Sequence, residues 1–177
     1  MKTISEEYLQ EQIKLHENPN YGVASVEFAP MVAELIKHSA PETVTDYGAG
    51  KQRLNSSLEK LGVSGFKYQP YDPAFPGYGE ALEADLVCCI DVLEHIEPHL
   101  LENVLADLAR ITRKAGFFTI HMGPAAKHLS DGRNAHLIQK PTSWWLPRLC
   151  EFFEVGNLQT HQVFGKGFLI IVGPKVS

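Results

Sequence analysis

The stretch V-T-D-Y-G-A-G-K-Q, residues 44–52, constrains the fold more than any other part of the chain. An apolar run ends in an acidic residue, Asp46, and two glycines, Gly48 and Gly50, follow at a spacing of two. Glycine adopts left-handed backbone conformations at little cost and lets a ligand approach backbone N–H groups closely. A strand that runs into such a turn predicts a binding site for a nucleotide-like ligand at its end.

The residues around the two glycines distinguish a dinucleotide ligand from a positively charged nucleoside. A nicotinamide dinucleotide fingerprint has the spacing G-x-G-x-x-G, and its helix N-terminus receives a pyrophosphate. Here the sixth position is Arg53, and Asp46 precedes the first glycine by two residues. A carboxylate at that point repels a pyrophosphate but accepts hydrogen bonds from a cationic amino-acid group. The spacing therefore favours a positively charged nucleoside over a dinucleotide.

Strand and helix patterns alternate along the chain. Short apolar runs predict strands over 43–47, 66–71, 85–90 and 117–122. Apolar stripes and caps predict helices over 5–17, 24–39, 97–114 and 141–153, and one through Leu54, Leu58 and Leu61. Pro30 predicts a kink or a late start in the second helix. Residues 155–162 and 167–172 predict a terminal antiparallel hairpin, which completes an α/β sandwich with a mostly parallel sheet.

Three acidic residues fall at the carboxyl ends of predicted strands, namely Asp46, Asp72 and Asp91. In open parallel sheets, ligands bind outside these ends, where the strand order reverses. The sequence therefore predicts a site at that edge of the sheet.

Bulk composition indicates one soluble, cytoplasmic domain over 1–177, because no internal repeat or low-complexity linker interrupts the chain. The net charge of −5 disfavours tight binding to nucleic acid. No apolar run approaches the roughly 20 residues that span a bilayer, and we expect no secretory signal and no membrane partner. Cys88, Cys89 and Cys150 indicate reduced thiols, with Cys88 and Cys89 on opposite faces of a strand.

Three motifs, in order, resemble those of one enzyme family. D-Y-G-A-G at 46–50 resembles the first motif of the class I S-adenosylmethionine-dependent methyltransferases, and Y-Q-P-Y-D at 68–72 places an acid where that family holds the ribose hydroxyls. D-V-L-E-H at 91–95 resembles the ubiquinone-biosynthesis-like branch. The resemblance covers roughly residues 42–175. It implies S-adenosylmethionine as cofactor, bound by Asp46, Tyr47, Gly48, Ala49, Gly50, Asp72, Asp91 and Val92.

The resemblance also implies a Rossmann-like three-layer sandwich, with two departures. Gln52 replaces the usual third glycine of the first motif. Only twelve residues separate Asp72 from Asp85, too few for the family's full third helix and strand. We therefore expect a reduced third strand, at most a short one at 80–82. Residues 1–40 are expected to form N-terminal helices that serve as a lid or as a dimer contact.

Three histidines are candidates for a general base. Methyl transfer from a sulfonium is an in-line displacement, in which the protein positions the acceptor and removes a proton from a hydroxyl. Histidine is the usual base near neutral pH. The candidates are His95, His121 and His136, each with a structural alternative: a packed, hydrogen-bonded residue, a near-core residue and an anchor of its loop, respectively.

The loop D-G-R-N-A-H, residues 131–136, is too polar for the core and too long for a tight turn. It predicts a functional loop over the cofactor face. Arg133 and His136 are candidates to bind an anionic or hydroxylated substrate. Of Trp144 and Trp145, one is a candidate for the core and the other for the pocket, and plain packing is the favoured interpretation for both.

A metal site is the sharper alternative. Asp91, Glu94 and His95 have i, i+3, i+4 spacing, so a helical turn would put them on one face. With His136 they would offer ligands for a divalent metal. This set is similar to that of the small-RNA 3′-end 2′-O-methyltransferases. Because Asp91 also fits the general family's cofactor site and the chain is acidic, we predict no metal.

The resemblance and the residues together predict methyl transfer from S-adenosylmethionine to a small-molecule acceptor, with oxygen as the methylated atom. Two alternatives stay open. One is a metal-dependent RNA 2′-O-methyltransferase of the small-RNA 3′-end type, and the other is a catalytically silent binding protein with a methyltransferase fold.

Overall fold

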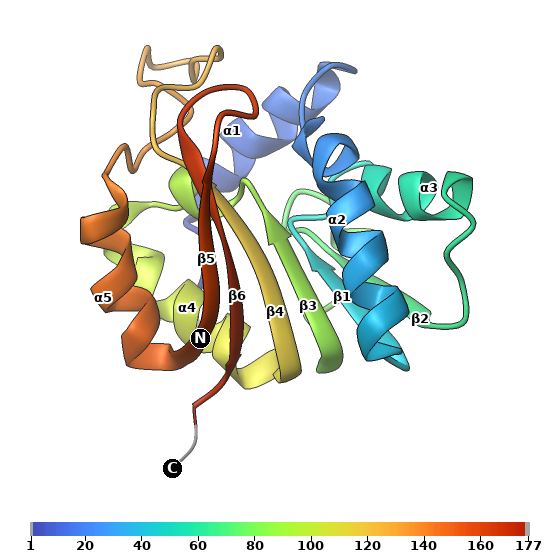
Figure 1. The fold of residues 1–177 in the computed structure, drawn as a ribbon. Helices are drawn as coiled ribbons and strands as arrows, with labels where there is room; N and C mark the ends of the chain where they lie inside the picture. Colours follow the sequence, from blue (N-terminus) through green and yellow to red (C-terminus); the bar gives the residue numbers. More distant parts are fainter. Residues whose placement is uncertain (1, 176–177) are drawn as a thin grey trace.

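A six-stranded sheet forms the centre of the computed structural model, which describes residues 2–175 (Figure 1). Its order is β2-β1-β3-β4-β6-β5, and the first four strands run parallel while β6 and β5 run antiparallel to their neighbours. This confirms the mostly parallel sheet with a terminal antiparallel hairpin. The strands are β1 Thr43–Tyr47, β2 Lys67–Tyr71, β3 Ala84–Ile90, β4 Thr112–His121, β5 Phe153–His161 and β6 Gly167–Pro174. Residues 1, 176 and 177 of the predicted domain lie outside the described part.

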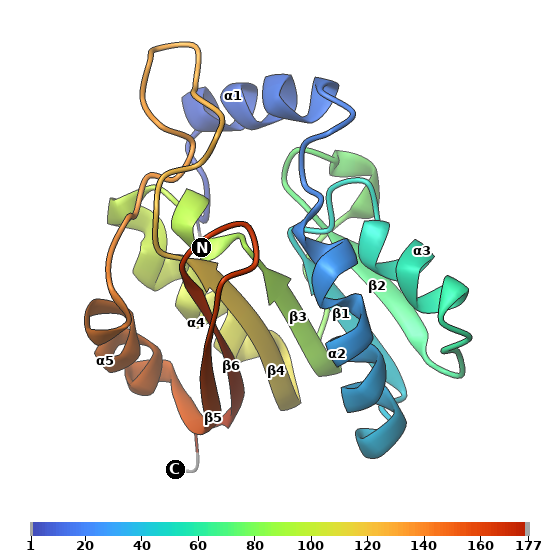
Figure 2. The same ribbon diagram turned by 45° about the horizontal axis from the view of Figure 1, so that its top comes forward.

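Helices cover both faces of the sheet, so the predicted three layers are present (Figure 1). One face packs against α2 (Ala24–Ser39) and α3 (Arg53–Lys60). The other packs against α4 (Leu101–Ile111) and α5 (Thr142–Phe152). Figure 2 shows α1 (Glu6–Glu17) separate from both layers, lying across the ends of the strands. Ser5 caps α1, as expected, because its hydroxyl accepts the Tyr8 N–H.

Alternation along the central strands divides the core into two halves. Cys88 packs toward α2 and α3, whereas Cys89 packs toward α4 and α5, as the sequence predicted. Phe117 and Phe118 divide in the same way. Because β3 is buried at every position, it needs apolar side chains on both faces, which explains its continuous apolar run. Cys150, by contrast, is exposed on α5.

The predicted helix over 97–114 is wrong at both ends. A 3₁₀ turn occupies Pro98–Leu100, and α4 ends at Ile111, where β4 begins without a loop. The Thr112 hydroxyl donates to the Leu108 carbonyl and closes the helix. Lys114 then reaches Asp85 across the strands, at 3.1 Å. Arg113 and Lys114 are therefore exposed strand residues, although their charge is typical of a helix end.

Two smaller predictions also change. Pro30 lies inside α2, which begins at Ala24, so the late start is wrong. Leu61 follows α3 and is 46% exposed, so only Leu54 and Leu58 form the buried stripe of that helix. Among the described residues, no helix combines the length and apolar character that a membrane crossing requires.

The segment between β2 and β3 is short, as predicted, and leaves β2 at the edge of the sheet. It contains a 3₁₀ turn, Pro76–Tyr78, and no strand at 80–82. The chain runs from β1 to β2 on one side, and then crosses to β3 on the other side of β1. The strand order therefore reverses beside β1, which is where such sheets bind their ligands.

Two leucines test how far the core explains stability. Leu105 is fully buried on α4, whereas Leu82 is 50% exposed. Leu105→Ala should lower the free energy of unfolding by about 2–5 kcal/mol, because it removes buried methyl groups and leaves a cavity. Leu82→Ala should change it by less than about 1 kcal/mol. Chemical denaturation of both variants measures the difference, and equal losses would contradict this description of the core.

Candidate functional site

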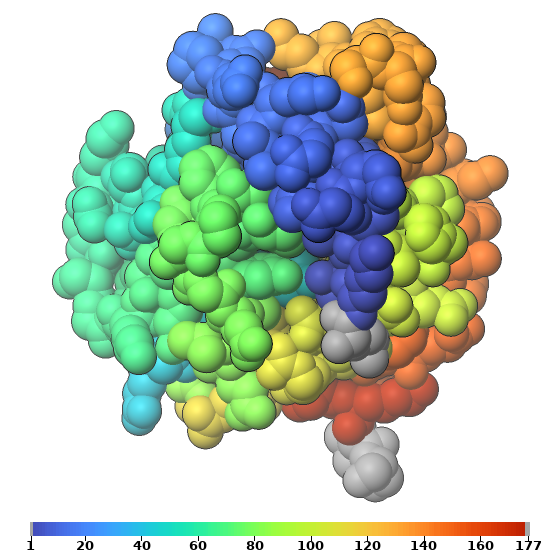
Figure 3. Space-filling view, turned by 180° about the vertical axis from the view of Figure 1, so that it is seen from behind, coloured from blue at the N-terminus to red at the C-terminus, as the bar shows by residue number. Residues whose placement is uncertain are grey.

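A cavity of about 410 Å³ lies at the carboxyl ends of β1, β2 and β3 and beneath α1. Figure 3 shows the N-terminal segment, in blue, running between the green segment and the orange loop on that side. All the residues predicted to bind the cofactor or to act as a base line the cavity: Asp46, Tyr47, Gly48, Ala49, Gly50, Asp72, Asp91, Val92, His95, His121 and His136. The topology has thus collected residues that lie far apart in the sequence.

The glycine turn is fixed to the end of β2. The N–H groups of Gly48 and Ala49 both donate to the Tyr71 carbonyl, at 2.8 and 3.0 Å. Gly48 has φ +84°, and a Cβ there would lie 2.4 Å from a methyl group of Val92. No side chain fits at position 48. The turn therefore needs glycine there, both for its left-handed conformation and for the close contact with Val92, which follows β3. Tyr47 points elsewhere, since its hydroxyl donates to Asp107 on α4.

Asp46 is a buried carboxyl group at the start of the turn, 3% exposed. The Tyr68 hydroxyl donates to its Oδ2. Burial raises the pKa of Asp46 to about 7, and this hydrogen bond opposes the rise only in part. A buried carboxylate with a neutral partner is well suited to a cationic ligand, because a positive charge would stabilise the ionised form.

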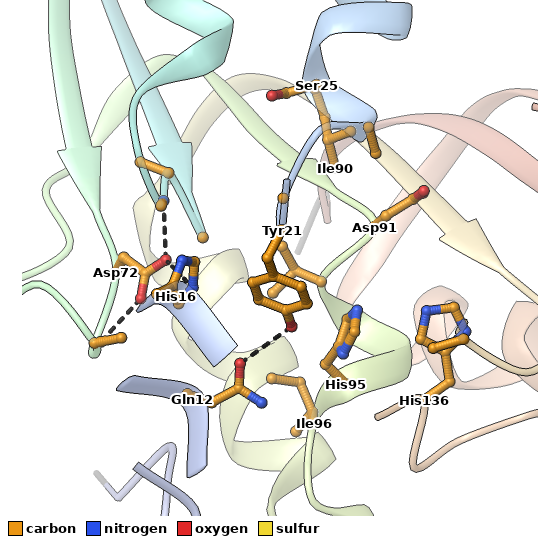
Figure 4. Close-up of a pocket in the computed structure, with 18 of the residues that line it drawn as sticks. Gln12, His16, Tyr21, Ser25, Asp72, Ile90, Asp91, His95, Ile96 and His136 are labelled. Carbon is orange, nitrogen blue, oxygen red and sulfur yellow. Dashed lines mark hydrogen bonds and ion pairs between the residues drawn. The ribbon is translucent and has the colours of Figure 1, made fainter. Parts of the chain in front are cut away.

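Asp72 follows β2 directly and lies opposite the glycine turn. The Gly50 N–H donates to its Oδ2 and the Ala74 N–H donates to its Oδ1, each at 2.9 Å (Figure 4). These bonds fix the plane of the carboxylate while leaving lone pairs on both oxygens. Such a carboxylate can accept further hydrogen bonds from hydroxyl groups in the cavity.

Asp91 adopts a left-handed conformation, with φ +51°. Its Oδ1 accepts the Thr119 hydroxyl at 2.6 Å, and burial raises its pKa. A residue in this conformation cannot continue into a regular helical turn. The expectation that Asp91, Glu94 and His95 share one helical face is therefore wrong for Asp91, although Leu93–His95 forms a 3₁₀ turn. Val92 instead contacts the glycine turn.

His95 and His136 each use one ring nitrogen to hold the ring. Nδ1 of His95 lies 2.9 Å from the Ala135 carbonyl, and Nδ1 of His136 lies 2.7 Å from the Gly123 carbonyl. Because a carbonyl only accepts, both Nδ1 atoms carry the proton, and both Nε2 atoms keep a free lone pair. Burial, with His136 nearby, lowers the pKa of His95 to about 3, and burial also lowers that of His136.

His121 uses both ring nitrogens. Its Nε2 lies 3.0 Å from the Phe164 carbonyl, and its Nδ1 accepts the Gly123 N–H at 3.1 Å. No lone pair is then free to receive a proton from a substrate. This geometry favours the structural alternative for His121, which holds the β5–β6 turn against the cavity.

Glu94 is fully buried and has one oxygen without a partner. Its Oε1 accepts the His121 N–H at 2.9 Å, whereas its buried Oε2 has no hydrogen-bond partner. Burial raises the pKa of Glu94 well above its usual range. Ligand atoms of Glu94, His95 and His136 all lie within 4.8 Å of one another. The structure thus brings together one carboxyl oxygen and one ring nitrogen from each of two imidazoles.

Three predicted residues do not reach the cavity. Arg133 is exposed and pairs with Asp131, at 2.6 Å. Trp145 is fully buried in the core, as expected for one of the pair. Trp144 stacks with Arg148, whose guanidinium carbon lies 3.7 Å from the ring centre, and it is not among the lining residues. Both tryptophans therefore serve packing.

The sequence prediction missed the residues that α1 and its following loop contribute. Gln12, His16 and Tyr21 line the cavity, and Figure 4 shows Tyr21 between His16 on one side and His95 on the other. Ring centroids lie 4.9 Å apart for His16–Tyr21 and 6.1 Å for Tyr21–His95. A signal was present, because Tyr8, Gln12 and His16 recur every four residues and share one helix face.

Solved structures share this arrangement of sheet and helices. The chain aligns with 1,6-didemethyltoxoflavin-N1-methyltransferase from Burkholderia thailandensis, which has bound 1,6-didemethyltoxoflavin and S-adenosylhomocysteine, with TM-score 0.68 and 16% identity over 99% of this chain and 92% of that one. For mitomycin 7-O-methyltransferase the TM-score is 0.69, with 14% identity over 96% of this chain and 60% of that one. For magnesium protoporphyrin IX methyltransferase from Synechocystis, with bound S-adenosylhomocysteine, the TM-score is 0.58, with 11% identity over 96% of this chain and 95% of that one.

The chain has the Rossmann-like methyltransferase fold. The predicted fold class is thereby confirmed, including the terminal antiparallel hairpin. The sequence matches no protein-family model and no curated protein. At these identities the likeness concerns the fold alone.

The raised pKa of Asp46 predicts a pH dependence of stability. A carboxyl group whose pKa is higher in the folded chain holds its proton more tightly there, so the free energy of unfolding should fall as pH rises from about 4 to about 7. Asp46→Asn should remove this fall. The free energy of unfolding of the variant, measured relative to the wild type, should therefore be higher at pH 8 than at pH 5 by about 2–4 kcal/mol. Denaturation at both pH values measures the change.

Asp85→Asn is the matched control with the opposite sign. The Glu42 N–H and Lys114 lower the pKa of Asp85, so its contribution to stability is present at neutral pH and lost on acidification. The Asp85 variant should therefore be destabilised at pH 8 and approach the wild type at low pH. The same pH profile in both variants would contradict the assignment for Asp46.

Proposed function

We propose that the chain is an S-adenosylmethionine-dependent methyltransferase that acts on a small-molecule acceptor, at oxygen. The observation that carries this proposal is the pair of carboxyl groups around the glycine turn. Asp46 lies buried two residues before the first glycine, and Asp72, after β2, accepts the N–H of the second. The fold likeness supports the proposal, since neighbours of known structure contain S-adenosylhomocysteine.

The cavity fits this cofactor on chemical grounds. Burial raises the pKa of Asp46 to about 7, and no residue of the described part of the chain forms an ion pair with it. Asp46 is placed to hold the ammonium group. Asp72 is placed to accept hydrogen bonds from the ribose hydroxyls. Gly48, Ala49 and Gly50 allow close approach to the backbone, and Val92 walls the turn. When bound, S-adenosylmethionine supplies an electrophilic methyl group.

The histidines support oxygen as the acceptor atom. The free Nε2 atoms of His95 and His136 can accept a hydrogen bond from a hydroxyl group. A group with a pKa of about 3 removes a proton poorly near neutral pH, so His95 is suited to orienting the hydroxyl. We assign the general base to His136. The ubiquinone-biosynthesis-like branch stays a prediction that rests on D-V-L-E-H.

Calorimetric titration with S-adenosylhomocysteine tests the cofactor. We expect binding to the wild type and none of NAD, because Asp46 repels a pyrophosphate. Asp72→Ala should weaken binding by about 10- to 100-fold, since it removes hydrogen bonds to a charged acceptor. Asp131→Ala, which changes an exposed carboxylate outside the cavity, should bind like the wild type.

Two results would contradict the proposal. Absence of binding would favour a catalytically silent protein with this fold, and equal affinity in Asp72→Ala and the wild type would remove Asp72 from the site. Asp72→Asn guards against loss of folding, because the amide oxygen preserves one acceptor while the charge is removed.

A second candidate function is supported by the cluster of Glu94, His95 and His136. From the sequence we expected no metal, but one ligand atom from each of these three residues lies within 4.8 Å of the others. Glu94 Oε2 is also buried without a hydrogen-bond partner among the described residues. Carbonyl groups orient both imidazoles through Nδ1, as outer partners do for histidines that bind metals. These residues would hold a divalent cation in metal-dependent 2′-O-methyl transfer to RNA. The net charge of −5 favours a small acceptor over RNA.

Metal analysis separates the two candidates. If the metal site exists, the purified protein should bind Mn²⁺ or Zn²⁺ in about equimolar amount, and Glu94→Gln should reduce the affinity by about 10- to 100-fold. His99→Ala, an exposed histidine in the next turn, is the control and should bind normally. Wild-type protein without affinity for either metal, and with methyl transfer unaffected by chelator, would sink the metal-dependent alternative and leave the main proposal intact.

A further inference from the structure

Helix α1 crosses the cavity and is held at both of its ends by polar contacts. At its N-terminal end, the Ser5 N–H donates to Glu97 at 2.7 Å and the Tyr8 hydroxyl donates to the His95 carbonyl at 2.6 Å. Glu11, near its middle, accepts the N–H and hydroxyl of Ser130. Tyr8 is its only buried residue, and it packs with Leu129 and Ala135 of the loop that follows β4, in a small cluster separate from the two main halves of the core.

At its C-terminal end, α1 and the two residues after it contact the glycine turn and the start of α3, through two backbone carbonyls and the imidazole of His16. Lys51, just after the glycine turn, donates to the Asn18 carbonyl at 2.9 Å, and Arg53 donates to the Pro19 carbonyl. The His16 ring lies against Gly50, where an added Cβ would be 3.0 Å away. It also contacts Phe75 edge-on, with ring centroids 4.9 Å apart. His16 thus lies beside Asp72 (Figure 4).

His16 differs from the other histidines of the cavity in its hydrogen bonding. His95 and His136 each use one ring nitrogen, and His121 uses both. For His16, Nδ1 is buried without a partner, and Nε2 lies 3.8 Å from Asp72 Oδ2, too far for a hydrogen bond. Of the two nitrogens, Nε2 lies next to Asp72 and can gain a partner from a ligand atom between them, which would offset part of the cost of burying the imidazole.

The gap between His16 and Asp72 fits one hydroxyl group. An oxygen atom can lie at hydrogen-bond distance from two atoms that are 3.8 Å apart. A hydroxyl both donates and accepts, so it can accept from Nε2–H while it donates to the Asp72 carboxylate. Burial lowers the pKa of His16, so the ring is neutral and carries one proton for this purpose.

We propose that His16 is a cofactor-binding residue: its imidazole and Asp72 together hold one ribose hydroxyl, and this bond fastens α1 over the cofactor. The inference rests on the proposed function, because it needs a ribonucleoside in the cavity. It adds a residue on the N-terminal helix to a site otherwise built from strand ends. It also makes α1 a strap, whose middle, at Glu11, contacts Ser130 in the loop that carries His136.

The test compares S-adenosylhomocysteine with its 2′-deoxy and 3′-deoxy analogues by calorimetric titration. His16→Ala should weaken binding of the parent compound by about 5- to 10-fold, the effect of one hydrogen bond. For the analogue that lacks the shared hydroxyl, His16→Ala and wild type should bind equally. His16→Asn, which keeps a polar side chain, should recover part of the loss. His38→Ala, an exposed histidine on α2, should change nothing.

Each outcome decides one point. If His16→Ala weakens all three ligands equally, the residue has only a packing role and the inference is overturned. If His16→Ala binds the parent compound like the wild type, the inference also fails, while the proposed function stands. If the wild type binds none of the three, the proposed function itself fails.

Hydrogen exchange supplies a second measurement. S-adenosylhomocysteine should slow exchange of the α1 amides in the wild type and leave it unchanged in His16→Ala at saturating ligand. Equal slowing in both proteins would show that His16 does not fasten the helix.

Discussion

Three backbone N–H groups in the glycine turn determine the rest of the cavity. Those of Gly48 and Ala49 donate to Tyr71, and that of Gly50 donates to Asp72, so the end of β1 and the end of β2 are locked together. The lock sets where Asp46 and Asp72 lie relative to each other. Because Gly48 also contacts Val92 after β3, the ends of three strands converge on a single turn of chain. The reversal of strand order beside β1 leaves room above that turn.

Several carboxyl groups are buried in or next to this cavity. Burial raises the pKa values of Asp46 and Asp91, which line the cavity, and of Glu94, the residue before His95. Among the described residues, no lysine or arginine forms an ion pair with any of the three. Unpaired carboxyl groups in such a place reduce stability, and natural proteins keep them where they have a use. An ammonium or sulfonium group would relieve this cost on binding. The electrostatics therefore favour a cationic ligand independently of the glycine pattern.

The sequence predicted those features that local patterns determine. The apolar run of β3, the stripe of α4 and the turn after Asp46 each follow from periodicity or from glycine chemistry, and the structure agrees with them. The predicted end of α4 was wrong because Arg113 and Lys114 are typical of a helix end, whereas the strand position of Lys114 involves an ion pair with Asp85, which is distant in sequence. The prediction that Asp91 lies on a helical face was wrong for a related reason, since hydrogen bonds to the distant Thr119 hold its left-handed backbone. The His16 contact could not be predicted, because it requires knowing that α1 crosses the strand ends.

The shortened segment after β2 has a consequence for the behaviour of the protein in concentrated solution. Without a further strand, β2 is the edge of the sheet, and an edge with free N–H and C=O groups recruits strands from other molecules. β2 has only five residues and includes Pro70, which has no N–H to offer an incoming chain. At the opposite edge, β5 is polar and has a bulge between Val155 and Asn157. Both borders of the sheet are thus poor templates for aggregation.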